Sequence, residues 1–239
     1  KSFMNIMKYS DAVVVSSNDT LNDLKNFAPE YYHKINVLHF VSQPIQKYNG
    51  LDINKLKEKY NINDTFFYMP NQFWKHKNHM TVFRAIDCLK KEGLEVKLIC
   101  TGHLSDYRNQ TYIDEIYNFI EKSNLSENIK ILGLVDMDDV YSLIKFSKAV
   151  INPSLFEGWS STVEECKSVG KNMILSDINV HREQYPTATF FDRKSVQSLK
   201  NVIKNYQEDE TNSKVDLLSI RTKKYADDYV NLTKKVINT

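Results

Sequence analysis

The stretch KAVINPSLFEGWSSTVEECKSVGKNMILSD, residues 148–177, contains a complete strand–helix–strand unit. Strands are predicted over 148–154 and 172–177, where apolar residues dominate, and a helix over 161–169. Short apolar strands that alternate with helices are typical of a parallel sheet covered by helices on both faces. In such sheets, ligands bind at the carboxyl ends of the strands.

The same alternation continues over most of the chain, and it predicts an α/β fold with a Rossmann-like parallel sheet. The expected strands are 65–72, 96–102, 129–133, 148–154, 172–177 and 188–192. The expected helices are 52–60, 78–92, 112–123, 138–146, 161–169 and 195–206. Together they make one complete domain, from about residue 46 to 212.

A partial second α/β domain is predicted before it. Strands are expected at 12–16 and 34–41, with a helix between them that ends before Pro29. The polar stretch 42–50 is interpreted as a linker, so residues 1–45 are assigned to the end of an N-terminal domain. Residues 213–239 are expected to form a C-terminal helix. Because the sequence begins with Lys1 and enters a helix-like pattern at once, it resembles a piece of a longer protein.

Composition excludes several classes of protein. The 239 residues include 32 basic and 30 acidic side chains, well interleaved, for a net charge of +2, so nucleic acid is not expected as a partner. Cys88, Cys100 and Cys166 show no CxxC pairing, which disfavours disulfides and zinc and indicates a reducing, cytoplasmic compartment. No apolar run approaches the roughly 20 residues that span a bilayer, and no signal peptide opens the sequence.

Two glutamates flank the turn after the strand 148–154. Gly158 lets a ligand approach the backbone of this turn, and the helix that begins after it presents N–H groups suited to phosphate. One turn into that helix, Glu165 is placed to accept hydrogen bonds from two vicinal ribose hydroxyls, each contributing about 1.5–3 kcal/mol. Glu157, in the turn, suits hydroxyls beyond the phosphates. Alternatively, Glu157 is a solvated loop residue and Glu165 only favours the helix N-terminus.

The segment FEGWSSTVEEC, residues 156–166, resembles the E-x7-E signature of retaining family-4 glycosyltransferases, which have the two-Rossmann-domain GT-B architecture. The resemblance covers about 45–212 as the donor-binding domain and 1–45 as the end of the acceptor domain. It implies that Glu157 faces the donor sugar and Glu165 binds the ribose. It also implies that main-chain amides of the turn meet the sugar and phosphates, at Gly158, Trp159, Ser160 and Ser161. Residues 160–162 depart from the frequent Gly-Leu-Pro.

The loop MPNQFWKHKNHM, residues 69–80, resembles the family loop in which an Arg and a Lys hold the donor diphosphate. Lys77 matches the lysine, whose charge steadies the leaving group, and the arginine position falls on Gln72. Gln72 offers only a neutral amide, so Lys75 or His76 is expected to compensate. A basic surface loop without a ligand is the alternative.

Three further loops complete the expected site. The loop CTGHLSD resembles the family's glycine-containing loop that lines the donor cleft; Gly102 is expected to have a structural role there, and His103 is a weaker candidate ligand. Leu134, in ILGLVD, occupies the position at which the resemblance places the nucleobase. In SDINVHREQYP, His181 and Glu183 either face the cleft between the domains or belong to a capped loop.

The resemblance implies transfer of a hexose from a UDP- or GDP-linked donor to an acceptor hydroxyl with retained configuration. Lys77 and Glu157 are the expected catalytic residues. No metal or cofactor is expected, because Lys77 and helix amides take the role of a cation. The implied acceptor is a glycan or lipid-linked glycan, in surface polysaccharide or lipopolysaccharide synthesis at the cytoplasmic face of a membrane. Membrane contact through the missing domain is expected to be peripheral.

Because the acceptor side of the cleft belongs to the N-terminal domain, this chain alone is expected to bind donor but to transfer little. Two alternatives stay open. A nucleotide-sugar epimerase of the same architecture would need paired acid and base side chains at the sugar carbon, and no strong set is found. A flavodoxin-like interaction domain would leave Lys77, Glu157 and Glu165 without a common purpose.

Overall fold

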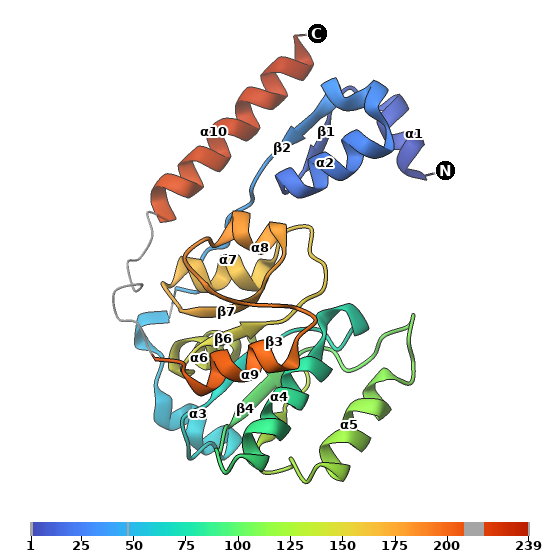
Figure 1. The fold of residues 1–239 in the computed structure, drawn as a ribbon. Helices are drawn as coiled ribbons and strands as arrows, with labels where there is room; N and C mark the ends of the chain where they lie inside the picture. Colours follow the sequence, from blue (N-terminus) through green and yellow to red (C-terminus); the bar gives the residue numbers. More distant parts are fainter. Residues whose placement is uncertain (1, 47, 208–217, 239) are drawn as a thin grey trace.

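The computed structural model describes residues 2–46, 48–207 and 218–238. Its centre is a six-stranded sheet in which neighbouring strands run parallel, in the order β5-β4-β3-β6-β7-β8 (Figure 1). The strands are β3 (Phe67–Pro70), β4 (Leu98–Thr101), β5 (Ile129–Ile131), β6 (Val150–Asn152), β7 (Met173–Ser176) and β8 (Thr189–Phe191). The predicted α/β fold class, with a parallel sheet, is therefore confirmed.

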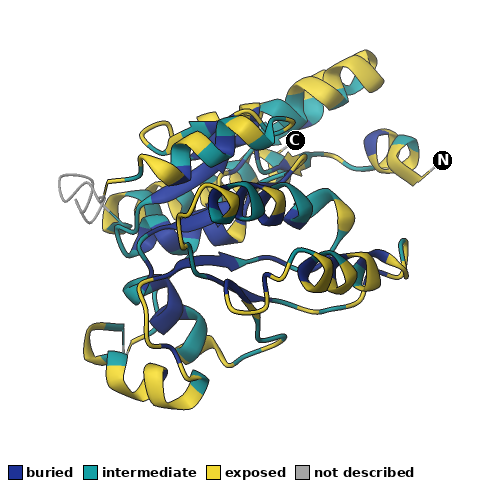
Figure 2. Ribbon diagram, turned by 60° about the horizontal axis from the view of Figure 1, so that its bottom comes forward, coloured by how far each residue is buried: buried dark blue, intermediate teal, exposed yellow. Residues whose placement is uncertain are grey.

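Helices cover both faces of this sheet, because successive side chains of a strand point to opposite sides. In β3, Phe67 and Met69 pack into one core cluster and Tyr68 into the other. The first cluster holds α4 (His79–Lys91), α5 (Tyr112–Lys122) and α9 (Val196–Lys204). The second holds α3 (Ile53–Tyr60), α6 (Met137–Phe146) and α7 (Ser161–Ser168). Figure 2 shows the strands as the buried centre between the two helical layers.

The strand order creates a switch point between β3 and β6. From β3 the chain moves outward through β4 to β5, then returns to β6 and moves outward the other way through β7 to β8. Tyr68 at the middle of β3 pairs with Ile99 of β4 on one side and Val150 of β6 on the other. The loops after β3 and β6 therefore leave the sheet in opposite directions, which opens a crevice at its carboxyl edge.

A small N-terminal unit precedes this domain. It consists of α1 (Ser2–Tyr9), β1 (Val13–Val15), α2 (Asn18–Phe27), the 3₁₀ helix η1 (Pro29–Lys34) and β2 (Ile35–Val37). The two strands pair in parallel around a core of Met7, Val15, Ala28 and Ile35. Helix α10 (Leu218–Ile237) runs beside β2 (Figure 1), and its residues Leu232 and Val236 line a cavity together with His33 of the N-terminal unit.

Several details differ from the predictions. The strands are shorter than expected, most of them at both ends, and α8 (Asn179–Gln184) forms where no helix was expected. Part of the predicted C-terminal helix, residues 213–217, lies outside the described residues, and the division into 1–45, 46–212 and 213–239 remains a prediction. Two further 3₁₀ helices are η2 (Tyr48–Gly50) and η3 (Lys75–Lys77).

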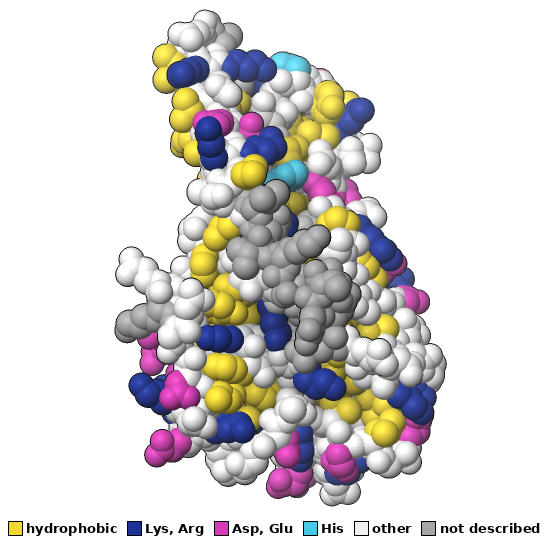
Figure 3. Space-filling model, turned by 90° about the vertical axis from the view of Figure 1, so that its left-hand side faces the viewer, with side chains coloured by type: hydrophobic (Ala, Val, Ile, Leu, Met, Phe, Trp, Pro, Cys, Tyr) yellow, Lys and Arg dark blue, Asp and Glu magenta, His cyan; other side chains and the backbone are white. Residues whose placement is uncertain are grey.

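The surface shows no concentration of one charge on the face seen in Figure 3, where Lys and Arg side chains lie among Asp and Glu. Within the described ranges, every helix is too short or too polar to cross a bilayer.

Candidate functional site

An ion pair occupies the crevice between the loops that follow β3 and β6. The ammonium of Lys77, at the end of η3, donates to Oε1 of Glu157 over 2.6 Å. The two side chains are only 14% and 9% exposed. Since β3 and β6 are neighbours, the sheet brings these residues together although eighty positions separate them. Two predicted catalytic residues thus meet at the switch point.

Buried polar groups fix the position of the Glu157 carboxylate. Its Oε1 also lies 2.7 Å from the hydroxyl of Ser154, which shares its single proton between Glu157 and Oδ1 of Asn152 at 2.8 Å. The amide nitrogen of Asn152 donates to the hydroxyl of Ser160, which in turn caps α7 by accepting from the N–H of Val163. The carboxylate and the start of α7 therefore belong to one network.

The main chain of the turn is partly committed to the protein itself. The N–H of Ser160 donates to Oε1 of Gln184 over 3.1 Å, and the amide nitrogen of Gln184 donates back to the Ser160 carbonyl. In contrast, the N–H groups of Gly158, Trp159 and Ser161 have no hydrogen-bond partner in the described part of the chain. Of the four main-chain amides expected to meet a donor, those of Gly158, Trp159 and Ser161 are therefore free, and that of Ser160 is occupied.

Trp159 joins the turn to the N-terminal unit. Its ring stacks on His39 at 4.4 Å between centroids and 7° between planes, and its Nε1 donates to the Phe40 carbonyl. Glu183 of α8 accepts from Nε2 of His39 and from the main-chain N–H of Asn18, at the start of α2. Glu183 therefore faces the N-terminal unit, as expected, whereas His181 is completely buried and does not.

Glu165 is a half-buried carboxylate without a hydrogen-bond or ion-pair partner among the described residues. Burial raises its pKa above the ordinary value. It lies close to the hydroxyls of Tyr68 and Tyr141: burial raises the pKa of both phenols, and the Glu165 charge adds to the effect. An unpaired carboxylate at the carboxyl edge of the sheet is suited to accept hydrogen bonds from a diol.

Its neighbour Glu164 is arranged differently. It is fully buried and receives the guanidinium of Arg221 in α10 at 2.5 Å and the amide of Gln184 at 3.1 Å. The two adjacent glutamates thus have separate tasks, because their side chains leave the helix on different sides. Glu164 ties α7 to α8 and α10, and Glu165 stays open.

Gln72 and Gly102 hold two loops together. Oε1 of Gln72 accepts from the N–H of His103 over 2.7 Å, and the N–H of Phe73 donates to the His103 carbonyl. Gly102 has a φ of +140°, and a Cβ there would lie 2.4 Å from the Asn71 carbonyl oxygen. No larger residue fits this close approach. Because Oε1 of Gln72 is occupied, only its uncharged amide nitrogen remains to donate a hydrogen bond to a ligand.

Leu134 is 68% exposed and follows β5, which is the edge strand of the sheet. It lies two strands away from β3, so any ligand that touches both Leu134 and Lys77 must be elongated along the carboxyl edge.

Of the buried polar residues beneath the pair, sequence reasoning named only His181 and gave no role to the others. Asn152, Ser154, Ser176, His181 and Gln184 are all at most 1% exposed. The available signal was polar residues directly after buried strands, as in INPS and ILSD, where a core position would be apolar.

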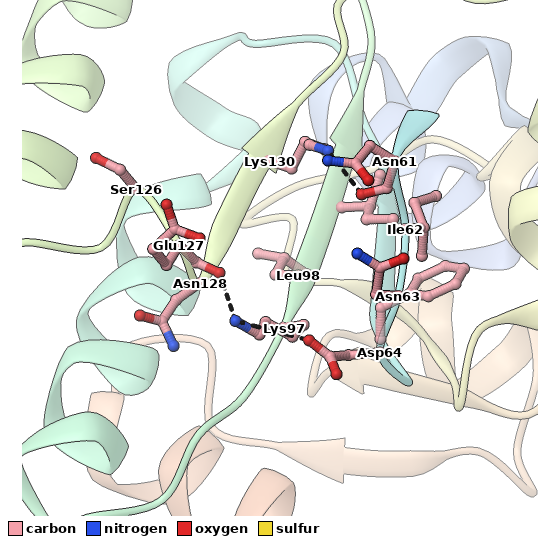
Figure 4. Close-up of a pocket in the computed structure, with 12 residues that line it drawn as sticks. Asn61, Ile62, Asn63, Asp64, Lys97, Leu98, Ser126, Glu127, Asn128 and Lys130 are labelled. Carbon is pink, nitrogen blue, oxygen red and sulfur yellow. Dashed lines mark hydrogen bonds and ion pairs between the residues drawn. The ribbon is translucent and has the colours of Figure 1, made fainter. Parts of the chain in front are cut away.

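A cavity of about 310 Å³ lies at the opposite, amino edge of the sheet (Figure 4). Its two lysines are occupied, since Lys130 donates to the carbonyls of Tyr60 and Asn61, and Lys97 to that of Glu127. Their charges are used within the protein, and we do not regard this cavity as the functional site.

Comparison with known proteins agrees with the fold. Sucrose-phosphate synthase from Thermosynechococcus elongatus superposes with a TM-score of 0.74 at 14% identity, over 98% of this chain and 60% of that one. A glycosyltransferase from Rickettsia africae gives 0.74 at 18% identity, over 98% and 67%. HepE of Anabaena, in complex with UDP and glucose, gives 0.79 at 14% identity, over 100% and 66%.

At these identities the likeness shows a shared fold, and the chain spans about 60% of the length of the synthase. Among curated proteins, none matches the sequence significantly. The family model described as glycosyl transferases group 1 matches residues 52–225, which include the whole six-stranded sheet and the site above it. The chain therefore belongs to the glycosyl transferases group 1 family.

Proposed function

We propose that this chain is the donor-binding part of a retaining, family-4 glycosyltransferase that transfers a hexose from UDP to an acceptor hydroxyl. The observation that carries the proposal is the Lys77–Glu157 pair at the switch point, together with the unpaired Glu165 in α7, the helix that follows the Glu157 turn. The likeness to HepE, whose structures hold UDP or UDP-glucose, favours UDP over GDP.

Binding of the donor exchanges partners within the site. The Lys77 ammonium turns from Glu157 to the diphosphate and stabilises the negative charge that develops on the leaving group. Glu157, released from Lys77 but still held by Ser154, accepts hydrogen bonds from hydroxyls of the hexose. The unpartnered N–H groups around Gly158 and at the start of α7 face the phosphates.

Glu165 binds the ribose. A carboxylate that accepts from both ribose hydroxyls stabilises the complex by about 1.5–3 kcal/mol for each bond. The edge near Leu134 takes the base, so the donor spans the loops after β6, β3 and β5 in turn. No metal is required, as Lys77 and the helix amides supply the positive charge.

The wider setting is proposed from the family resemblance alone. The acceptor is a glycan or a lipid-linked glycan of a surface polysaccharide or lipopolysaccharide, reached at the cytoplasmic face of a membrane. This chain by itself binds donor and transfers little.

Calorimetric titration with UDP, UDP-glucose and GDP tests the proposal. UDP should bind, GDP should bind more weakly, and Glu165→Gln should weaken UDP at least about tenfold, as expected for losing about 1.4 kcal/mol or more. Glu121→Gln, on the exposed side of α5, is the matched control and should leave UDP affinity unchanged. If UDP does not bind, or if both variants bind alike, the assignment of the ribose site is wrong.

A further inference from the structure

Three buried polar residues, His181, Ser176 and Ser154, connect α8 to the carboxylate of Glu157, and we call them the polar column. Nδ1 of His181 lies 2.9 Å from the carbonyl oxygen of Ser176, at the end of β7. The hydroxyl of Ser176 donates to the carbonyl of Ser154 over 2.6 Å, and the hydroxyl of Ser154 lies 2.7 Å from Oε1 of Glu157. His181, Ser176 and Ser154 are all completely buried.

The contacts define the state of the imidazole. Because the partner of Nδ1 is a carbonyl oxygen, Nδ1 carries the proton, and Nε2 is an acceptor. This Nε2 is buried and has no hydrogen-bond partner in the described part of the chain. Burial lowers the pKa of His181, so the ring is neutral near pH 7, and the charges of Glu157 and Lys77 act on it in opposite directions.

Packing alone does not account for this column. The surrounding residues of α8 and β7 include Val180 and Leu175, and an apolar side chain at 181 would fill the same space without an unpaired buried nitrogen. Two consecutive hydrogen bonds to main-chain carbonyls instead connect the elements: the first joins α8 to the end of β7, and the second joins the end of β7 to the segment after β6. Ser154, which carries the second of those carbonyls, is the residue whose hydroxyl contacts Glu157.

We propose that His181 is a positioning residue for Glu157: through Ser176 and Ser154, it holds the carboxylate in the orientation that receives the hexose of a nucleotide-sugar. This inference rests on the proposed function, and it concerns the sugar part of the donor only. Lys77, which under the proposed function leaves Glu157 for the diphosphate, and Glu165, which serves the ribose, have no hydrogen bond to His181, Ser176 or Ser154 among the described residues. His181 should therefore influence the affinity for UDP-glucose without influencing the affinity for UDP.

The test compares UDP-glucose with UDP by calorimetry in variants of His181. Glu157→Gln is the reference variant. It should lower the ratio of UDP-glucose affinity to UDP affinity about tenfold. His181→Leu should lower this ratio similarly, with UDP affinity within about twofold of the original. His181→Asn should restore it, since its amide nitrogen takes the place of Nδ1. In the Glu157→Gln background, His181→Leu should have no further effect.

Ser176→Ala is the second variant, and Ser147→Ala is its control. Ser147 is also buried and also donates to a main-chain carbonyl, that of Ile144, but at the amino edge of the sheet. Only Ser176→Ala should lower the ratio. Equal losses for UDP and UDP-glucose in His181→Leu, or failure of His181→Asn to restore the ratio, would overturn the inference.

A measurement without ligand separates this inference from the proposed function. Thermal unfolding of Glu157→Gln, His181→Leu and the double variant should show non-additive shifts of Tm, because the two residues share one network. If UDP fails to bind but the shifts are non-additive, the proposed function and the hexose as ligand are wrong, while the structural coupling of His181 to Glu157 stands. Additive shifts would refute the positioning role whatever the nucleotide result.

Discussion

Lys77 and Glu157 form a nearly buried ion pair at 2.6 Å, and no local pattern of the sequence joins them. The pair exists because the loops after β3 and β6 leave adjacent strands. In the absence of donor, each residue satisfies the charge of the other. This keeps two charged side chains in a crevice where either one alone would be costly.

Removing one partner of the pair should destabilise the fold. Lys77→Met leaves Glu157 without its cation in a largely buried position, and the free energy of unfolding should fall by about 1–3 kcal/mol. Urea unfolding at pH 7 measures this. The pair of Lys91 with Asp87, at 2.7 Å and with an exposed lysine, is the matched control, and Lys91→Met should cost less than about 0.5 kcal/mol. Equal costs for the two variants would contradict the burial argument.

Glu165 should make stability fall as pH rises. Burial raises its pKa in the folded state above the ordinary value of 4.5, which applies to the unfolded state. At a pH between the unfolded and the folded pKa, the folded state therefore binds more protons than the unfolded state. The contribution is complete below pH 4.5 and is lost as pH rises through the raised pKa. Glu165→Gln, which cannot ionise, should therefore be more stable than the original at pH 7 and should lack this pH dependence.

Urea unfolding of both proteins from pH 4 to pH 8 is the measurement for Glu165. The same variant should lose UDP affinity, because the charged acceptor is gone. Glu165→Gln should therefore gain stability and lose UDP affinity, because the same unpaired carboxylate destabilises the fold and binds the ligand. A variant that is less stable than the original at pH 7 would show that Glu165 has a stabilising partner.

Gly102→Ala should damage the fold directly. The φ of +140° is strained for any other residue, and the added Cβ would collide with the Asn71 carbonyl, which is main chain and cannot swing away. A loss of at least about 2 kcal/mol is expected in chemical denaturation. Gly50→Ala, where nothing lies within 4 Å of the added carbon, should change stability by less than about 0.5 kcal/mol.

Glu164 should control the docking of α10. Glu164→Ala removes the buried partner of Arg221 and should increase amide hydrogen exchange along α10, with a stability loss of about 3–5 kcal/mol. Asp228→Asn, which breaks an exposed pair within α10, serves as the control and should leave exchange in the rest of that helix nearly unchanged. Unaltered exchange in Glu164→Ala would mean that other contacts hold α10.

Local sequence patterns predicted the elements well where they were long and apolar. All six strands of the sheet fall within their predicted ranges, because uninterrupted apolar runs such as those around Tyr68 and Ile151 leave little choice but a buried strand. The helix α8 was missed because it is six residues long and polar, and it is stabilised by tertiary contacts, such as those of Gln184 with Ser160.

By itself, the sequence determined the alternation of strands and helices and the spacing of Glu157 and Glu165, since these depend on neighbours along the chain. Only the tertiary structure decided that Lys77 pairs with Glu157, that Gln184 accepts from the N–H of Ser160 and that His181 bonds the Ser176 carbonyl at the end of β7. Strand order and side-chain direction set these contacts. Both result from how the elements pack together, and residues far apart in the sequence contribute to them jointly.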